Sequence, residues 1–291
     1  MDFVTLILNL DRKIIFGCVA LLVVWPLLVP IQMPIGTTPE VRSIFSAIDA
    51  LPNGSDVMIA ADYDPSSKPE LQPFTYSLLA HCFEKDHKVH ILTLWPGGPA
   101  LIQQAIEEVG AQYGKSSGTD YCFLGYKPGN AAVVGGLTNS ITGTYPTDFY
   151  NRPTANMPIY QRVQRVKDCD YIVDIAAGAT VEVWIAFASA PENVPMSAAC
   201  TAVSAAGYYP YYQAGQLDGI SGGMKGSAEY DVLLMDKYPN FKNGGARIAG
   251  NAVKGMDAQS AVHLFIVLSI ILANICYFIA NKRQREERRN A

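Results

Sequence analysis

Two apolar segments near the two ends of the chain constrain its fold more than any other feature of the sequence. Residues 14 to 31 contain no charged side chain, and residues 262 to 280 contain only His263 and Asn274 as strongly polar positions. A helix needs about 20 residues, at about 1.5 Å per residue, to cross about 30 Å of hydrocarbon. We therefore predict two transmembrane helices, at residues 14–35 and 261–280.

The first segment fits an uncleaved anchor better than a signal peptide. A signal peptide has an apolar core of about 7–15 residues followed by a small-residue cleavage site. The run in this chain is longer and no such site follows it. Pro26, Pro30 and Pro34 would instead kink or end the helix.

These anchors divide the chain into five segments. They are an N-terminal flank (1–13), a transmembrane helix (14–35), a large domain (36–258), a second transmembrane helix (261–280) and a basic tail (281–291). In such a two-pass protein both ends lie on one side of the membrane, and the domain lies on the other side.

The distribution of basic residues predicts which side that is. Arg12 and Lys13 precede the first span, and five basic residues follow the second. The positive-inside rule then places both termini in the cytoplasm and the domain outside it. Asp2 and Asp11 reduce the N-terminal charge, so the opposite orientation stays open.

Within the domain, short apolar runs alternate with helical patterns. Continuous apolar runs are typical of parallel strands that are buried on both faces. The runs are residues 56–62, 88–94, 121–125, 171–175 and 195–203, and residues 70–85 and 100–113 carry apolar side chains at helical spacing. This order predicts an α/β domain with a mostly parallel, Rossmann-like sheet and helices on both faces.

The loops after the predicted strands are the expected ligand site, because the crevice of an open α/β sheet lies beyond the carboxyl ends of its strands. The candidate ligand-binding residues of these loops and of the glycine-rich stretch 222–226 are Asp62, Asp64, Lys127, Asp174, Gly178, Thr180 and Lys225. Lys127 precedes an expected helix start, where a phosphate or carboxylate could also meet backbone N–H groups.

Two glycine-rich strings suggest enzymes, but their contexts do not. Residues 219–223 match the G-x-S-x-G nucleophile elbow, yet residues 214–219 make a poor strand and the only later histidine is His263, in the second anchor. Residues 222–226 precede a possible helix capped by Ser227 and fit neither nucleotide-binding fingerprint. Close packing of backbone explains these glycines better.

No metal site is predicted. Asp62, Asp64 and Asp174 could converge on a divalent cation, but aspartate at strand ends more often caps a helix or a turn.

Histidine and cysteine give no metal signal either. His81, His87 and His90 cluster with Cys82 at the edge of the sheet opposite the expected crevice, where we expect surface or core roles. The four domain cysteines lack the close spacing of a zinc site, and three disulfide pairings among them stay open.

Charge excludes nucleic acid as a partner, since the net charge is −4 and no basic patch is interleaved with aromatic residues. The lipid bilayer is the expected partner. Residues 144–158 and 208–212 are rich in proline and tyrosine and interrupt the alternation. Disordered linkers carry few aromatics, so both segments should pack against the core or against another subunit. A homo-oligomer or a larger membrane complex is therefore expected.

The sequence also resembles uncharacterised prokaryotic proteins that carry a Rossmann-like domain on membrane anchors. The similar segments are Asp-Tyr-Asp-Pro at 62–65, Leu-Trp-Pro at 94–96, Gly-Tyr-Lys-Pro-Gly at 125–129 and Gly-Gly-Met-Lys-Gly at 222–226. The resemblance implies the fold and the anchors, and it implies no activity.

The leading interpretation is a two-span membrane protein whose α/β domain serves oligomeric assembly or small-ligand binding. The alternative is a membrane-anchored enzyme that acts on a small anionic substrate through Asp62, Lys127, Asp174 and Lys225. No pattern identifies a catalytic residue or a cofactor.

Overall fold

The computed structural model describes residues 3–29, 31, 33–239, 241 and 250–290. The chain forms two compact units, one of residues 35–253 and one of residues 1–34 with 254–291. The positions outside the description fall in the predicted segments 1–13, 14–35, 36–258 and 281–291.

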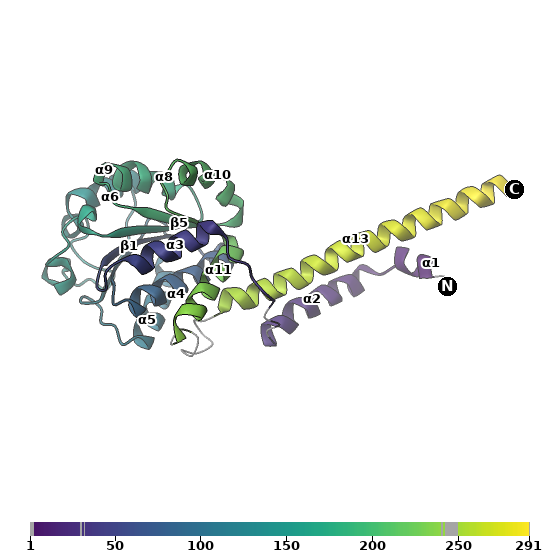
Figure 1. Cartoon of the computed structure of the whole chain (residues 1–291), viewed down its shortest axis with the longest axis horizontal. Coiled ribbons are helices and arrows are strands. Elements are labelled where there is room, and N and C mark those ends of the chain that lie inside the picture. Colours follow the sequence, from purple (N-terminus) through teal and green to yellow (C-terminus); the bar gives the residue numbers. More distant parts are fainter. Residues whose placement is uncertain (1–2, 30, 32, 240, 242–249, 291) are drawn as a thin grey trace. The chain divides into compact units, whose positions relative to one another are not determined.

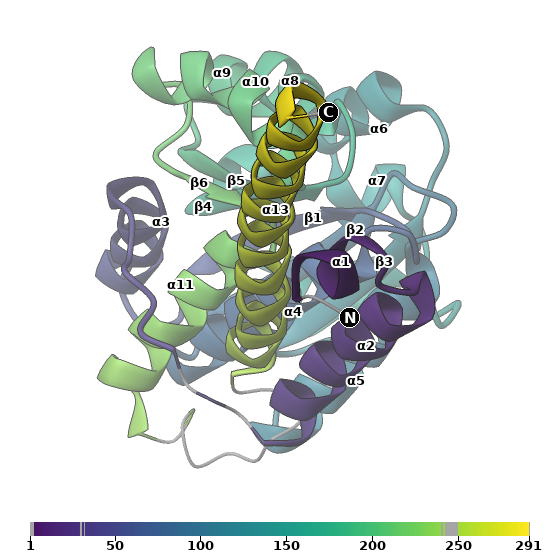
Figure 2. The ribbon, with the colours of Figure 1, turned by 90° about the vertical axis from the view of Figure 1, so that its right-hand side faces the viewer.

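A six-stranded parallel sheet forms the middle of the larger unit, in the order β3-β2-β1-β4-β5-β6. Its strands are β1 (Asp56–Asp62), β2 (Lys88–Thr93), β3 (Tyr121–Tyr126), β4 (Tyr171–Ala176), β5 (Met196–Cys200) and β6 (Ile220–Gly222). Figure 2 shows this order from β6 across to β3. The strand order reverses between β1 and β4, which is the switch point of a doubly wound sheet. The predicted α/β class and the Rossmann-like parallel sheet are confirmed.

Helices cover both faces of the sheet, as predicted (Figure 1). One face carries α3 (Pro39–Ala50), α4 (Lys68–Glu84), α5 (Pro99–Gln112) and α11 (Gly223–Lys237). The other carries α6 (Asn130–Asn139), α7 (Ile141–Thr144), α8 (Thr180–Trp184), α9 (Ala190–Glu192) and α10 (Ala202–Gln213). Side chains alternate along a strand, so Val57 and Ile59 of β1 join the first core while Met58 and Ala60 join the second.

Four details of the sequence interpretation need correction. β5 ends at Cys200, and residues 202–213, which include the tyrosine-rich run 208–212, form the helix α10. Residues 214–219 form no strand, as expected, but the next residues, Ile220–Gly222, form the short strand β6, which was not predicted. Ser227 does not cap α11, which begins at Gly223. The helix α3 had no counterpart among the predicted elements.

Residues 144–158 depart from regular structure as expected. They contain only short helical turns, the end of α7 and a three-residue turn, η1 (Thr154–Asn156). Further single turns follow at η2 (Pro158–Tyr160) and η3 (Val166–Asp168), and a π-helical turn, η4 (Ile185–Ser189), joins α8 to α9.

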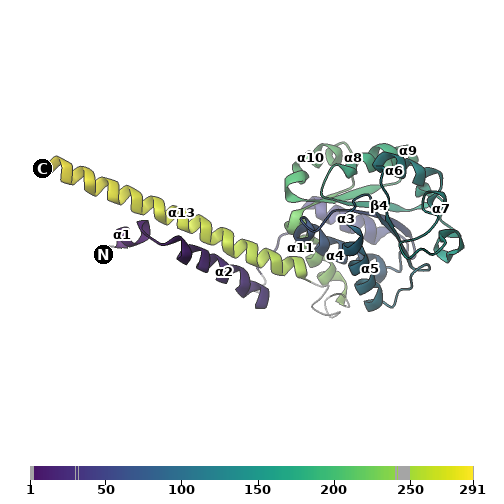
Figure 3. The same ribbon diagram turned by 180° about the vertical axis from the view of Figure 1, so that it is seen from behind.

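The smaller unit contains α1 (Phe3–Leu8), α2 (Arg12–Leu28) and most of α13 (Asn251–Asn290). Within the described part of the chain, α13 is the one helix long and apolar enough to cross a membrane. α1 and the last turns of α13 lie at the same end of this unit (Figure 3). After α2, the backbone N–H groups of Ile31 and Met33 donate hydrogen bonds of 3.0 and 2.9 Å to the carboxylate of Asp257 on α13.

Candidate functional site

Asp62 and Asp174 form a buried pair of carboxyl groups at the switch point of the sheet. Asp62 ends β1, and Asp174 lies on the neighbouring strand β4, in register with Ala60. Both point to the face covered by α6 and α8, because they continue the alternation of Ala60 and Ile172. Both are fully buried. Asp62 accepts a hydrogen bond of 2.6 Å from the backbone N–H of Leu94.

Burial raises the pKa of both carboxyl groups, because an ionised carboxylate loses its hydration there. Asp62 also faces the N–H of Leu94, the hydroxyl groups of Thr180 and Thr93 and the indole of Trp184, which favour its ionised form. The charge of Asp62 raises the pKa of Asp174 further. The pair as a whole therefore holds a proton to higher pH than an isolated carboxyl group would.

Six buried polar atoms of the described residues around this pair lack a hydrogen-bond partner. They are Asp62 Oδ2, both carboxyl oxygens of Asp174, Thr180 Oγ1, Trp184 Nε1 and the hydroxyl of Tyr145. Buried polar atoms in folded proteins nearly always have a partner. The Thr180 hydroxyl and the Trp184 indole nevertheless lie close enough to Asp62 to lower its pKa, so the polar atoms of this cluster face one another across distances longer than a normal hydrogen bond.

Directly above the pair, the expected crevice is filled by the protein's own side chains. A Cβ atom at Gly178 would lie 2.8 Å from a ring carbon of Trp95. The hydroxyl of Tyr208 donates a hydrogen bond of 2.6 Å to the carbonyl of Gly178. Thr180 is buried as well. The structure thus brings Asp62, Asp174, Gly178 and Thr180 together, as predicted, but beneath protein side chains.

An open cleft lies beside this point, at the carboxyl end of β3. Its volume is about 400 Å³. Its walls come from Pro99 at the start of α5, from residues 124–127 and from residues 145–149. Lys127, the candidate cation of the sequence analysis, lines this cleft.

The ammonium group of Lys127 is free to meet an anion. It donates a hydrogen bond to the carbonyl of Thr144 and lies 5.4 Å from the ring centroid of Tyr145. It forms an ion pair with none of the described carboxylates. Asp148, the acidic residue of the cleft, is bound by Arg152 at 2.6 Å. The cleft thus contains a lysine that no carboxylate of the cleft-lining residues neutralises.

The start of α6 lies three residues beyond Lys127 and adds a second, partial positive charge. Gly129 stands at the N-cap with φ of 120°, a left-handed conformation that glycine adopts readily, and no side chain caps the helix. The first backbone N–H groups of a helix are unsatisfied and carry the positive end of its dipole. Such a helix start favours a carboxylate or phosphate, and it follows in the chain after Lys127, the last residue of this loop that lines the cleft.

Tyr145 connects the cleft to the buried carboxyl pair. Its ring lines the cleft and its hydroxyl is buried. Burial and the charge of Asp62 both raise the pKa of that hydroxyl. Sequence reasoning missed Tyr145 and Trp184. For Tyr145 the available signal is the aromatic segment 144–158, which the sequence predicts to pack against the core or against another subunit; for Trp184 the sequence offers no such signal.

Asp64 and Lys225 lie away from the cleft. The carboxylate of Asp64 accepts hydrogen bonds from the backbone and hydroxyl of Ser66, at 2.9 and 2.6 Å, and so stabilises a turn. Lys225 pairs with Glu229 on α11, which follows β6. β6 and β3 are the two outer strands, and five strand spacings separate them by about 24 Å. Lys127 and Lys225 therefore cannot hold the same small ligand.

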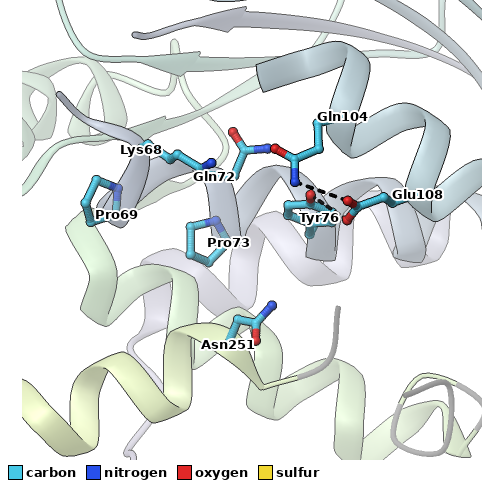
Figure 4. A pocket seen from close by; sticks show the side chains of 8 residues that line it. All are labelled: Lys68, Pro69, Gln72, Pro73, Tyr76, Gln104, Glu108 and Asn251. Carbon is cyan, nitrogen blue, oxygen red and sulfur yellow. Dashed lines mark hydrogen bonds between the residues drawn. The ribbon is translucent and has the colours of Figure 1, made fainter. Parts of the chain in front are cut away.

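A larger groove, of about 570 Å³, lies between α4 and α5 (Figure 4). Its carboxylate, Glu108, already accepts hydrogen bonds from Tyr76 at 2.8 Å and from Gln104 at 3.1 Å. Pro69 and Pro73 form much of its remaining wall. Lys68 also lines this groove and forms no ion pair with a described carboxylate. We assign the functional site to the smaller cleft because its lysine lies over Tyr145, which interacts with the buried carboxyl pair.

The histidines at the opposite edge have separate structural partners. His81 contacts the hydroxyl of Tyr230 at 2.7 Å, and His90 contacts Asp56 at 3.1 Å. Burial lowers the pKa of His81 to about 3, so its imidazole is neutral. No group of three or more metal-ligating side chains occurs in the described part of the chain, and all six cysteines are free thiols.

The carboxyl edge of the sheet thus has two layers, a buried carboxyl pair at the switch point and an open cleft at β3, with Tyr145 between them. No family model, curated protein or solved structure matches the chain. Its function is therefore inferred from the geometry of its own residues.

Proposed function

We propose that the domain binds a small anionic ligand in the β3 cleft, on a protein that α13 attaches to a membrane. The observation that carries this proposal is Lys127, an ammonium group in an open cleft with no carboxylate partner among the described residues. The uncapped start of α6 supports the same ligand class.

The ligand class is a phosphate or a carboxylate of a small molecule rather than a dinucleotide. A dinucleotide-binding sheet has a glycine-rich turn after its first strand, whereas the turn after β1 reads Asp-Tyr-Asp-Pro-Ser-Ser. The switch-point crevice where a dinucleotide would lie is occupied by Trp95 and Tyr208. If the domain is extracytoplasmic, soluble nucleotides are also scarce there.

Calorimetric titration of the full chain in mild detergent with inorganic sulfate and phosphate tests the anion site. Lys127→Ala should weaken binding at least tenfold, since a hydrogen bond to a charged group contributes about 1.5–3 kcal/mol. Lys167→Ala is the matched control, because Lys167 is an exposed lysine just before β4, at the other edge of the sheet. Equal affinities of the two variants would contradict the proposal.

We propose further that α2 crosses the membrane beside α13, with both chain ends in the cytoplasm. α2 has 17 residues and begins with Arg12 and Lys13. Large apolar side chains such as Phe16 (70%) and Leu21 (71%) are exposed on it, as Phe278 (68%) is on α13. A bilayer would cover these surfaces, and basic residues flank both helices at the end that the positive-inside rule places in the cytoplasm.

Assembly is a second candidate function, favoured by the surface of α10. This helix carries no charged residue. Val203 and Tyr209 on it are 89% and 40% exposed. Mass measurement in mild detergent tests assembly: an oligomer that Val203→Glu dissociates would support it, and a monomer at all concentrations would exclude it.

The enzyme alternative receives less support from the arrangement of its four candidate residues. Asp62 and Asp174 are buried, Lys127 lies in the cleft, and Lys225 lies beyond the opposite outer strand. They do not converge on one substrate.

A further inference from the structure

We infer that an anion in the β3 cleft binds together with a proton, which the Asp62–Asp174 pair takes up. This inference rests on the proposed anion site and names its regulation. It assigns a role to the buried carboxyl pair, which the anion site itself does not use.

The Asp62–Asp174 pair has no positively charged partner among the described residues. No lysine, arginine or histidine of the described residues forms an ion pair with Asp62 or Asp174. The titratable groups that face the pair are all acidic or neutral, namely Tyr145, Glu182 of α8, Cys200 of β5 and Tyr208 of α10. The pair therefore responds to any added negative charge by holding a proton more tightly.

Tyr145 links the cleft to the carboxyl pair. Tyr145 forms a wall of the cleft, and its hydroxyl interacts electrostatically with Asp62. The ammonium of Lys127 lies over the ring of the same tyrosine. Tyr145 is buried, and protein atoms screen the field of a bound anion less than bulk water does.

The effects of anion binding and proton binding on each other are reciprocal. If the anion raises the proton affinity of the pair, protonation of the pair must tighten anion binding by the same factor. No bond between heavy atoms forms or breaks, and the proton comes from the solvent. We expect binding to tighten about five- to tenfold between pH 8 and pH 5.5, the lower end of the range typical of coupling between sites.

Calorimetric titration of the full chain with sulfate tests the inference, because sulfate does not itself titrate in this range. Titrations at one pH in two buffers of different ionisation enthalpy give the number of protons taken up. The double variant Asp62→Asn/Asp174→Asn should still bind sulfate but take up no proton. Asp64→Asn, which changes a partly exposed carboxylate at the same edge, should behave as the wild type.

Proton uptake that disappears only in the double variant supports the inference. Sulfate binding without uptake, or with uptake that persists in the double variant, overturns it and leaves the anion site standing. Absence of sulfate binding overturns both. If the double variant does not fold, the infrared band of protonated carboxyl groups in the wild type must grow on sulfate addition, and a constant band overturns the inference.

Discussion

At the residue scale, the fold holds several buried carboxyl groups whose surroundings differ. Asp62 and Asp174 are buried together at the switch point, while Asp148 is held by Arg152. Asp231 of α11 accepts hydrogen bonds from Ser77 of α4 and, at 3.2 Å, from the backbone N–H of Ala252 in the first turn of α13. A carboxylate in this place satisfies the unpaired amides of a helix start. The sequence alone does not show which hydrogen-bond or ion-pair partner each of these buried aspartates has.

Asp231 should make the stability of the domain depend on pH. Burial raises its pKa from 3.8 to about 7. The folded state therefore binds a proton that the unfolded state releases, and this stabilisation is complete below about pH 4 and lost as pH rises to about 7. Asp231→Asn should remove this part of the slope, so its melting temperature should fall less between pH 5 and pH 8.

Thermal unfolding followed by tryptophan fluorescence at several pH values checks this expectation. Asp236→Asn, an exposed position on the same helix, is the control and should follow the wild type. Parallel pH profiles for Asp231→Asn and the wild type would show that the buried carboxyl group is not the source.

At the element scale, the strands that the sequence predicts are those buried on both faces. β1, β2, β3 and β4 are continuous apolar runs, so their positions follow from composition alone. β6 could not be found in this way, because it has three residues and reads Ile-Ser-Gly. Its place depends on contacts with β5 and α3, which are distant in sequence. α10 was missed because Pro210 and its tyrosines are typical of irregular structure.

The packing of β6 against α3 should be sensitive to one methyl group. A Cβ atom at Gly219 would lie 2.4 Å from the carbonyl oxygen of Glu40 and 2.5 Å from the side chain of Ile44. Since backbone cannot yield as a flexible side chain does, Gly219→Ala should destabilise the protein by about 1–3 kcal/mol.

Gly207→Ala on α10 is the matched control. No atom lies within 4 Å of its added methyl group, and alanine favours a helix over glycine by about 1 kcal/mol. This variant should be neutral or more stable. Chemical denaturation of both variants measures the difference, and equal stabilities would mean that α3 is not packed against Gly219 as described.

At the scale of the whole molecule, the second of the two predicted anchors is the one with structural support. α13 contains the predicted span 261–280, and its length and composition suit a membrane. The first anchor and the orientation stay predictions, because α2 has 17 helical residues and a charge bias acts during insertion rather than in the fold. The sequence predicts a ligand site at the carboxyl ends of the strands, where the cleft lies. It does not predict that Trp95 fills the central crevice, because that depends on a tertiary contact between Trp95 and Gly178.

The proposed topology predicts the outcome of limited proteolysis on sealed vesicles. A protease on the cytoplasmic face should remove the basic tail, residues 281–291, and leave the domain intact. Immunoblots against a tag on the tail and against the domain report the two outcomes. Digestion of the domain from that face with the tail protected would reverse the orientation, and loss of both together would exclude a two-pass arrangement.

The anion site at Lys127 is the central proposal for this protein, and an experimental map of the full chain prepared in phosphate tests it most directly. We predict density for one anion in the β3 cleft, within hydrogen-bonding distance of the Lys127 ammonium group and near the first N–H groups of α6. An empty cleft at saturating phosphate, or an anion bound instead in the groove between α4 and α5 beside Lys68, would contradict the proposal.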